Sequence, residues 1–286
     1  MRRALGLLLM AQALGAQSPQ NPSPMVEPVR AHARVEQVAV PGERIPLSMG
    51  ELYLPVKHGA MPPLLVFFHG SAWLVESAAS EGGMAAISVS LGAGSGTYEK
   101  PFLEAGRFEA LLKEAEDKGK VRFGELTLAG WSAGGGAVRQ IIKDDASFGR
   151  VGRVIIIDGI HASYVDGKPG PLESKLETAK LDSIVHFARE AMAGKKKMLI
   201  THSEIFPGTF ASTTETAHYI AGQLGVVEHP VMCWGPGGMQ ALSEAQKGGF
   251  TMVGYAGNSA PDHVDELHAL RFFLKGRPLT KHCAKP

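Results

Sequence analysis

Six short apolar runs alternate with helical patterns along most of the chain, and this alternation restricts the possible folds more than any other feature. Continuous apolar runs of this length fit strands that are covered on both faces. Strands separated by helices form a mainly parallel sheet with helices on both faces, so we predict an α/β fold. The strands are expected at residues 62–68, 84–91, 123–129, 151–157, 197–201 and 250–255, and the helices at 102–118, 133–143, 172–193, 213–224 and 264–275.

Two further segments do not follow this alternation. Residues 33–40 and 45–54 alternate loosely around Pro41-Gly42, which predicts an antiparallel hairpin. Residues 226–249 form a longer connection with a Gly- and Pro-rich centre. We predict an irregular excursion there that helps to wall a pocket.

Length and charge limit the domain count and the partners. A chain of 286 residues that is 44% hydrophobic can bury the core of one large domain, which we place at residues 33–286. Its net charge is +1, and the only dense basic run is Lys195, Lys196 and Lys197. This is too little for a nucleic-acid footprint, so no nucleic-acid partner is expected, while the oligomeric state stays open.

The N-terminus has the pattern of a secretory signal peptide. Arg2 and Arg3 precede an apolar stretch over residues 4–14, and small residues follow as a cleavage site. We predict a signal peptide over residues 1–16 and a flexible lead-in over 17–32, hence a secreted or periplasmic protein. The stretch is too short for a stable membrane anchor. Export would permit a disulfide between the two cysteines, Cys233 and Cys283, but two unpaired thiols are an equal alternative.

The apolar run at 126–129 leads into Gly130-Trp131-Ser132-Ala133-Gly134, a G-x-S-x-G pattern. In a tight strand-to-helix turn, glycine is needed on both sides of a strained serine. Ser132 would then be exposed above the sheet as a nucleophile. The N–H of Ala133, at the start of the next helix, would receive a developing oxyanion.

A serine nucleophile needs an imidazole base, and the imidazole needs a carboxylate that fixes its tautomer. His263 is the best base, since it follows the last predicted strand and opens the final helix. His268 lies inside that helix and is expected to be a packing or surface residue. For the acid, Asp158 directly ends the run at 151–157 and is preferred, with Glu204 as the alternative. In a parallel sheet such strand ends meet at one edge.

Residues after the run at 62–68 complete the candidate site. His69-Gly70 ends this strand, and a backbone N–H of Ser71 or Ala72 would complete the oxyanion hole. We expect Trp73, Trp131 and Phe206 to line an apolar substrate site, although large aromatic residues also serve as core.

With these residues the chain resembles the α/β-hydrolase family, in particular its secreted serine esterases. The resemblance rests on His69-Gly70, on the motif around Ser132 and on Asp262-His263, and covers roughly residues 35–274. It implies hydrolysis of carboxylic esters, small or polymeric, through an acyl-enzyme on Ser132, and it implies no large lid. The family usually takes its acid from the later strand, near Glu204, whereas some lipases use the earlier one.

Two other functions are compatible with parts of this sequence. A non-catalytic homologue that acts as a ligand- or partner-binding module is the alternative, although such proteins usually lose part of the triad. A metallohydrolase is not favoured, because the histidines lack ligand spacing such as H-x-x-x-H. We therefore expect neither a metal nor another cofactor.

Overall fold

The computed structural model describes residues 34–167, 174–279 and 283–284. The predicted signal peptide and lead-in lie outside these residues. Within them, one sheet contains eleven strands: β1 (Gly42–Pro46), β2 (Glu51–Pro55), β3 (Leu64–Phe68), β4 (Ala85–Val89), β5 (Leu126–Trp131), β6 (Val151–Ile157), β7 (Lys197–Ser203), β8 (His229–Trp234), β9 (Gln240–Lys247), β10 (Phe250–Tyr255) and β11 (Cys283–Ala284).

The strand order is β1-β2-β4-β3-β5-β6-β7-β10-β9-β8-β11. The six strands from β4 to β10 in this order are parallel to one another. They correspond to the six predicted apolar runs, so the predicted parallel sheet is confirmed at the centre. Antiparallel strands flank it on both sides. The functional consequence is that the carboxyl ends of β3, β5, β6, β7 and β10 meet along one edge.

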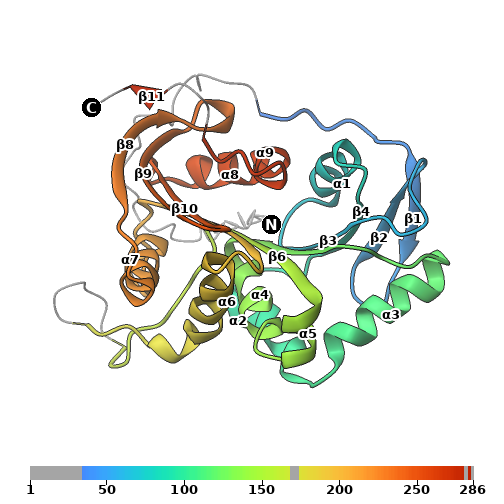
Figure 1. The fold of residues 1–286 in the computed structure, drawn as a ribbon, viewed down its shortest axis with the longest axis horizontal. Coiled ribbons are helices and arrows are strands. Elements are labelled where there is room, and N and C mark those ends of the chain that lie inside the picture. The colour runs from blue at the N-terminus through green and yellow to red at the C-terminus, as the bar shows by residue number, and fades with distance from the viewer. Residues whose placement is uncertain (1–33, 168–173, 280–282, 285–286) are drawn as a thin grey trace, which may run out of the picture.

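Helices cover both faces of the sheet, as predicted (Figure 1). In Figure 1, α1, α8 and α9 lie above the sheet, and α2 to α7 lie below it. Their bounds are α1 (Ala72–Glu81), α2 (Ser95–Glu99), α3 (Arg107–Gly119), α4 (Gly135–Ile141), α5 (Asp145–Arg150), α6 (Asp182–Met192), α7 (Thr213–Leu224), α8 (Ala260–His268) and α9 (Leu270–Leu274).

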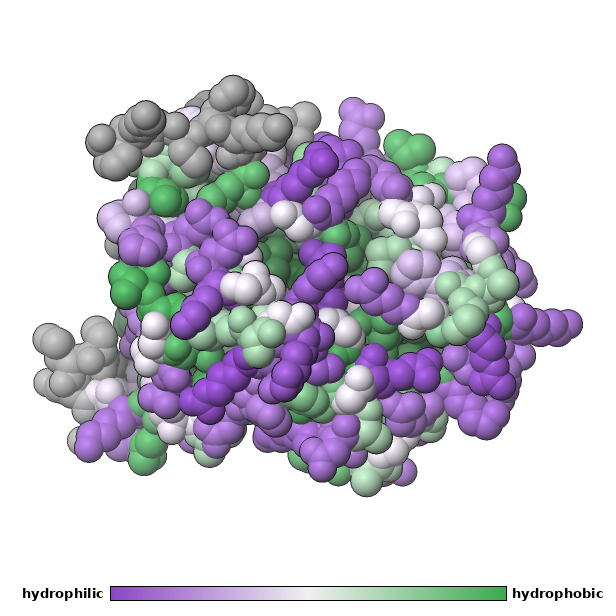
Figure 2. Space-filling model, in the orientation of Figure 1, coloured by the Kyte–Doolittle hydropathy of each residue, from purple (hydrophilic) through white to green (hydrophobic). Residues whose placement is uncertain are grey.

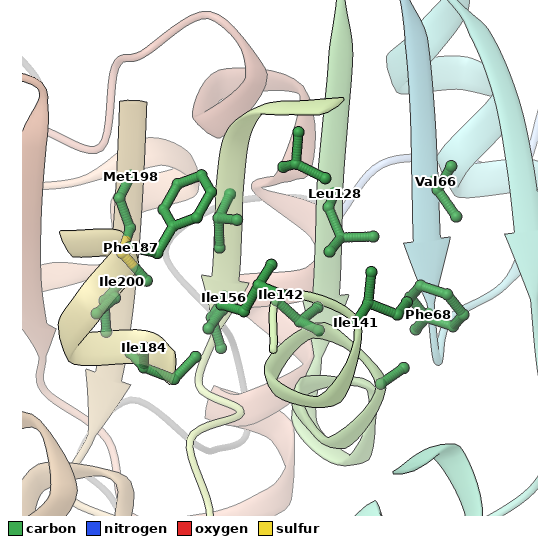
Figure 3. Close-up of a cluster of buried hydrophobic side chains, with 14 of the residues drawn as sticks. Val66, Phe68, Leu128, Ile141, Ile142, Ile156, Ile184, Phe187, Met198 and Ile200 are labelled. Atoms are coloured by element: carbon green, nitrogen blue, oxygen red, sulfur yellow. The ribbon is translucent and has the colours of Figure 1, made fainter. Parts of the chain in front are cut away.

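The parallel strands are buried on both faces, and alternate side chains feed two separate hydrophobic clusters. In β6, Val154 and Ile156 belong to the larger cluster, whereas Ile155 and Ile157 belong to the smaller one. Figure 3 shows the larger cluster, in which strand side chains meet those of α4 and α6. This two-sided burial explains why the strands read as continuous apolar runs.

The N-terminal hairpin exists, but its predicted position was wrong. β1 and β2 pair through a turn in which the N–H of Leu47 donates to the carbonyl of Gly50. Gly50 has φ +88°, a conformation that glycine adopts without strain, so the turn forms there and not at Pro41-Gly42. Residues 34–40 form no strand.

The interpretation of residues 226–249 as an irregular excursion was also wrong. They form β8 and β9, an antiparallel hairpin that extends the sheet beyond β10. Most side chains of these two strands are exposed or half-buried, so no apolar run marked them. Helices α1, α2 and α5 were not predicted, and the predicted helix at 264–275 is two helices, α8 and α9.

The C-terminal strand answers the cysteine question for Cys233. This residue is disulfide-bonded, and the antiparallel register sets the backbone of Cys283 opposite it.

The surface seen in Figure 2 is mainly hydrophilic, with hydrophobic residues scattered across it. Among the described residues no helix is long and apolar enough to cross a membrane.

Candidate active site

The turn after β5 holds Ser132 in a left-handed backbone conformation, with φ +50°. A Cβ atom at Gly130 would lie 2.6 Å from the carbonyl carbon of Gly134, and one at Gly134 would overlap the carbonyl oxygen of Phe68. Both glycines of the motif are therefore required by close backbone approach, as the sequence predicted. A short 3-10 turn, η2 (Ser132–Gly134), then leads into α4. The N–H of Ala133 lies within this turn, just before α4 begins.

The structure sets His263 against Asp158. His263 lies in the first turn of α8, and its Nδ1 donates to Oδ2 of Asp158 over 2.6 Å. Asp158 directly follows β6 and has φ +40°, an unusual conformation for a residue with a side chain. A Cβ on Gly159, the next residue, would lie 2.6 Å from the carbonyl oxygen of Ser132. The acid candidate is thus adjacent to the serine turn.

The Asp158 carboxylate is almost completely buried and fully hydrogen-bonded. Oδ1 accepts from the Thr213 hydroxyl (2.5 Å) and the Ser203 N–H (3.1 Å), and Oδ2 accepts from the Ser203 hydroxyl (2.7 Å) as well as from His263. Burial raises the pKa of this carboxyl, but the bond to His263, its charge and the two hydroxyl donors outweigh burial. The net effect is a pKa of Asp158 well below its usual range, so it is ionised at neutral pH.

A capping arrangement fixes the loop before His263. The Asp262 carboxylate accepts from the N–H groups of Asn258 and Ser259, each over 3.1 Å, and from the Ser259 hydroxyl over 2.6 Å. In this capping box Asp262 is the third residue of α8 and directly precedes His263. Asp262, which is itself buried, thereby sets the position of His263.

Trp131 lies between two histidines. Its ring stacks on His263 with centroids 4.5 Å apart, and on His69 with centroids 5.0 Å apart. Its Nε1 donates to the carbonyl oxygen of His263 over 3.0 Å. Trp131 therefore supports the imidazole from behind, which differs from the predicted substrate contact: it is absent from the lining of both cavities that contain Ser132.

His69 is held at the end of β3 by Tyr98. Its Nδ1 lies 2.8 Å from the Tyr98 hydroxyl, which also donates to the carbonyl of Gly92. Burial, together with the charge of His263, lowers the pKa of His69. The side chain thus ties β3 to the loop after β4.

Two cavities open beside Ser132, and the serine lines both. One has a volume of about 450 Å³ and includes Ala133, Arg139 and Lys180. The other has a volume of about 300 Å³ and includes His263 and Asp158. A serine, a histidine and a buried carboxylate thus converge on an accessible space above the carboxyl ends of β5, β6 and β10.

The chain has an α/β-hydrolase fold. A parallel sheet is covered by helices on both faces, a serine occupies the sharp turn after β5, and an acid and a histidine follow in that order along the chain. Within the described residues no cluster of His, Cys, Asp and Glu is arranged to hold a metal ion.

The sequence matches no protein-family model and none of the curated proteins. Solved structures with a similar fold include an esterase from Pyrobaculum calidifontis, with 13% identity over 82% of this chain and 84% of that one and a TM-score of 0.44. A carboxylesterase from Bacillus subtilis has 12% identity over 84% and 93%, with a TM-score of 0.40. A hormone-sensitive lipase from a metagenome library has 13% identity over 86% and 88%, with a TM-score of 0.43. At such identities the likeness concerns the fold alone.

Some predicted site residues lie elsewhere in the hydrolase fold. Trp73 packs edge-on against His268 and lines a separate cavity with Arg44 and Glu76. Glu204 follows β7 and makes its backbone bond to Gly257, so it is not the partner of His263. In the register of the two strands Ile157 lies opposite Thr201, so β7 runs two residues further than β6 before Glu204 follows it. Asp158, which follows β6, is the carboxylate bonded to the imidazole.

The predicted oxyanion and substrate residues are only partly brought together. Ala133 and Phe206 line the cavities beside Ser132, but Ser71 and Ala72 line neither. Ser71 is the N-cap of α1, a helix that the sequence analysis missed. Sequence reasoning also missed His161 and Phe210, which line both cavities. For His161 the available sequence signal was its position shortly after a predicted strand. For Phe210 the sequence offered no signal.

Proposed function

We propose that this protein hydrolyses carboxylic esters through an acyl-enzyme on Ser132, with His263 as the base and Asp158 as the acid. The observation that carries the proposal is the hydrogen bond between His263 and a buried, ionised Asp158 at a cavity that also exposes Ser132. With Nδ1 of His263 fixed on the carboxylate, Nε2 is left to accept a proton. It makes no hydrogen bond to another described residue.

The proposed reaction has two halves. His263 takes the proton of Ser132 as its oxygen attacks the ester carbonyl, and the N–H of Ala133 stabilises the oxyanion. His263 then protonates the leaving alcohol. In the second half the same imidazole activates a water molecule that releases the acid from Ser132.

Removing the nucleophile tests this proposal. With p-nitrophenyl acetate as substrate, Ser132→Ala should lower kcat by about 10⁴ or more. Circular dichroism and the melting temperature should remain as in the native protein, because the variant removes only one oxygen. A phosphonofluoridate should label Ser132 alone. Hydrolysis that survives Ser132→Ala would mean that another group carries the activity.

The alternative, a binding module without catalysis, conflicts with the preserved bond between His263 and Asp158 and with the strained conformations of Ser132 and Asp158. Strain of this kind persists where function requires it. A binding module would show neither labelling nor turnover.

We also propose that residues 1–16 direct export of the protein. The supporting observations are the charged, apolar and small-residue pattern of this segment and the disulfide at Cys233, a bond typical of oxidising compartments. N-terminal sequencing of native material should give a start after Ala13, Gly15 or Ala16. A protein that retains Met1 would contradict it.

A further inference from the structure

The two cavities at Ser132 differ in the catalytic groups that they contain. Both are lined by Ser132, His161 and Phe210, which form their common boundary. Only the 450 Å³ cavity includes Ala133, the oxyanion donor. Only the 300 Å³ cavity includes His263, the proton donor to the leaving group.

This difference assigns the two halves of an ester to the two cavities. The leaving oxygen must lie near the imidazole that protonates it, so the alcohol occupies the cavity with His263. The acyl chain extends from the carbonyl carbon away from the leaving group. It therefore occupies the cavity with Ala133, which we call the acyl cavity; the other is the alcohol cavity.

The acyl cavity is lined by two cationic side chains, Arg139 and Lys180, and by no carboxylate among the described residues. Arg139 is buried, and it donates to Oε2 of Glu99 over 2.5 Å and to the carbonyl of His161 over 2.6 Å. These bonds fix its guanidinium in the wall. The guanidinium of Arg139 thus stays at the cavity as one half of an ion pair with Glu99, and Lys180 is the cation that can move.

Lys180 is the movable cation of the acyl cavity. It forms an ion pair with Glu177 over 2.9 Å, but both side chains are about one-third or more exposed (34% and 42%). Exposed pairs of this kind contribute little stability, so Lys180 can turn to an anionic ligand at small cost. Burial lowers the pKa of His161 to about 4, so this ring adds no charge at neutral pH.

The alcohol cavity has the opposite character. Among the described residues that line it, Asp158 is the one carboxylate, and Ile205, Phe206, Pro207 and Ala260 form an apolar part of the wall. An anion in this cavity would face Asp158 without a lysine or arginine in the lining. A neutral, apolar alcohol fits it.

We propose that the preferred substrates are esters with an anionic acyl group, such as a monoester of a dicarboxylic acid, and a neutral apolar alcohol. Lys180 and Arg139 then determine specificity by facing the distal carboxylate of the acyl chain. This inference rests on the proposed esterase function and adds the substrate class.

Matched p-nitrophenyl esters test the assignment. The hydrogen adipate and heptanoate esters have the same leaving group and similar chain length, and they differ in the distal carboxylate. We expect a higher kcat/KM for the adipate ester. Lys180→Met, which keeps the chain but removes the charge, should lower the adipate-to-heptanoate ratio by roughly five- to tenfold, as expected for a lost charged contact; Lys180→Arg should largely retain it.

Lys195→Met is the matched control, because Lys195 forms a comparable exposed ion pair with Glu190 and lines neither cavity. It should leave the ratio unchanged. A native protein that favours heptanoate, or a ratio that Lys180→Met leaves unchanged, overturns the inference.

A second ester pair tests the orientation. The acetate ester of 4-hydroxybenzoate has an anionic leaving group and should react more slowly than phenyl acetate once the rates are corrected for the difference in leaving-group pKa. If the native protein prefers the ester with the anionic leaving group, and Lys180→Met abolishes this preference, the assignment of the acyl and alcohol groups to the two cavities must be reversed. Failure of the proposed function itself is recognised separately, since then p-nitrophenyl acetate would not be hydrolysed in a Ser132-dependent way.

Discussion

Among the described residues two histidines, His263 and His202, are hydrogen-bonded to a carboxylate, and they differ in the contacts of the second ring nitrogen. His263 bonds to Asp158 through Nδ1 and lines the alcohol cavity, and its Nε2 makes no hydrogen bond to another described residue. His202 bonds to Glu228 through Nε2 (3.1 Å), but its Nδ1 lies 2.9 Å from the Thr214 hydroxyl, which donates to the carbonyl of Ser203. Both nitrogens of His202 are occupied. A carboxylate partner alone therefore does not make a histidine a candidate base. The ring also needs a second nitrogen that is free to accept a proton at a cavity.

The strongest test of this comparison removes each carboxylate charge. Asp158→Asn should lower kcat/KM for p-nitrophenyl acetate by about 10⁴, because the imidazole loses its tautomer control. Glu228→Gln, the matched change in the other pair, should alter kcat/KM by less than about threefold. A large loss in Glu228→Gln, or activity retained in Asp158→Asn, would show that the pairs had been assigned the wrong way round.

The second pair should instead matter for stability. The side chains of His202 and Glu228 are only 6% and 10% exposed, and Glu228 also accepts from Ser243 over 3.0 Å. His202→Gln leaves this carboxylate without its main partner, so we expect the free energy of unfolding to fall by about 3 kcal/mol, as for other broken buried pairs. Urea denaturation measures it. An unchanged free energy of unfolding would mean that water or other groups replace His202 as the partner of Glu228, and would contradict this prediction.

Adjacent threonines offer a finer comparison, because Thr213 donates to Asp158 whereas Thr214 serves His202. Thr213→Val removes one hydroxyl bond to the acid and should lower kcat/KM by roughly tenfold, the equivalent of about 1.4 kcal/mol. Thr214→Val should leave kcat/KM unchanged and lower only stability. Equal kinetic effects in the two variants would contradict the comparison.

A smaller effect is expected from pH. His161 has a folded-state pKa lowered to about 4 from an ordinary 6.5, mainly by burial. The unfolded chain then binds more protons than the folded one between these values, so stability is fully present above pH 6.5 and is lost as pH falls toward 4. In His161→Asn, the slope of unfolding free energy against pH should be shallower in this window. An unchanged slope would mean that other titratable groups cause the pH dependence of stability in this window.

The sequence was sufficient for the parallel centre of the sheet because strands buried on both faces leave an unmistakable apolar run. β8 and β9 could not be found in this way, since their side chains are mostly exposed and their pairing depends on partners far along the chain. The same contrast explains the turn at Gly50. Its position depends on a register between β1 and β2 that loose alternation does not define.

The candidate site was predictable to a similar degree. Strand ends and spacing led to Ser132, His263 and Asp158, which the structure brings together, although their catalytic roles stay predictions. Trp73 could not be placed, because the direction of a side chain on an unpredicted helix, α1, is not contained in a local pattern. His161 and Phe210 become visible only when two loops meet in space.

The disulfide at Cys233 has a consequence for self-association. β8 is the outermost long strand, and within the described residues β11 pairs with it at Met232 and Cys233. Unpaired edge strands are templates for association between copies of a protein. Pro230 blunts part of this edge by removing an N–H donor. Reduction of the bond should therefore release β11 from β8 and lead to aggregation. Because β6, β7, β10 and β9 lie between β5 and β8, the candidate site at the end of β5 should still be intact.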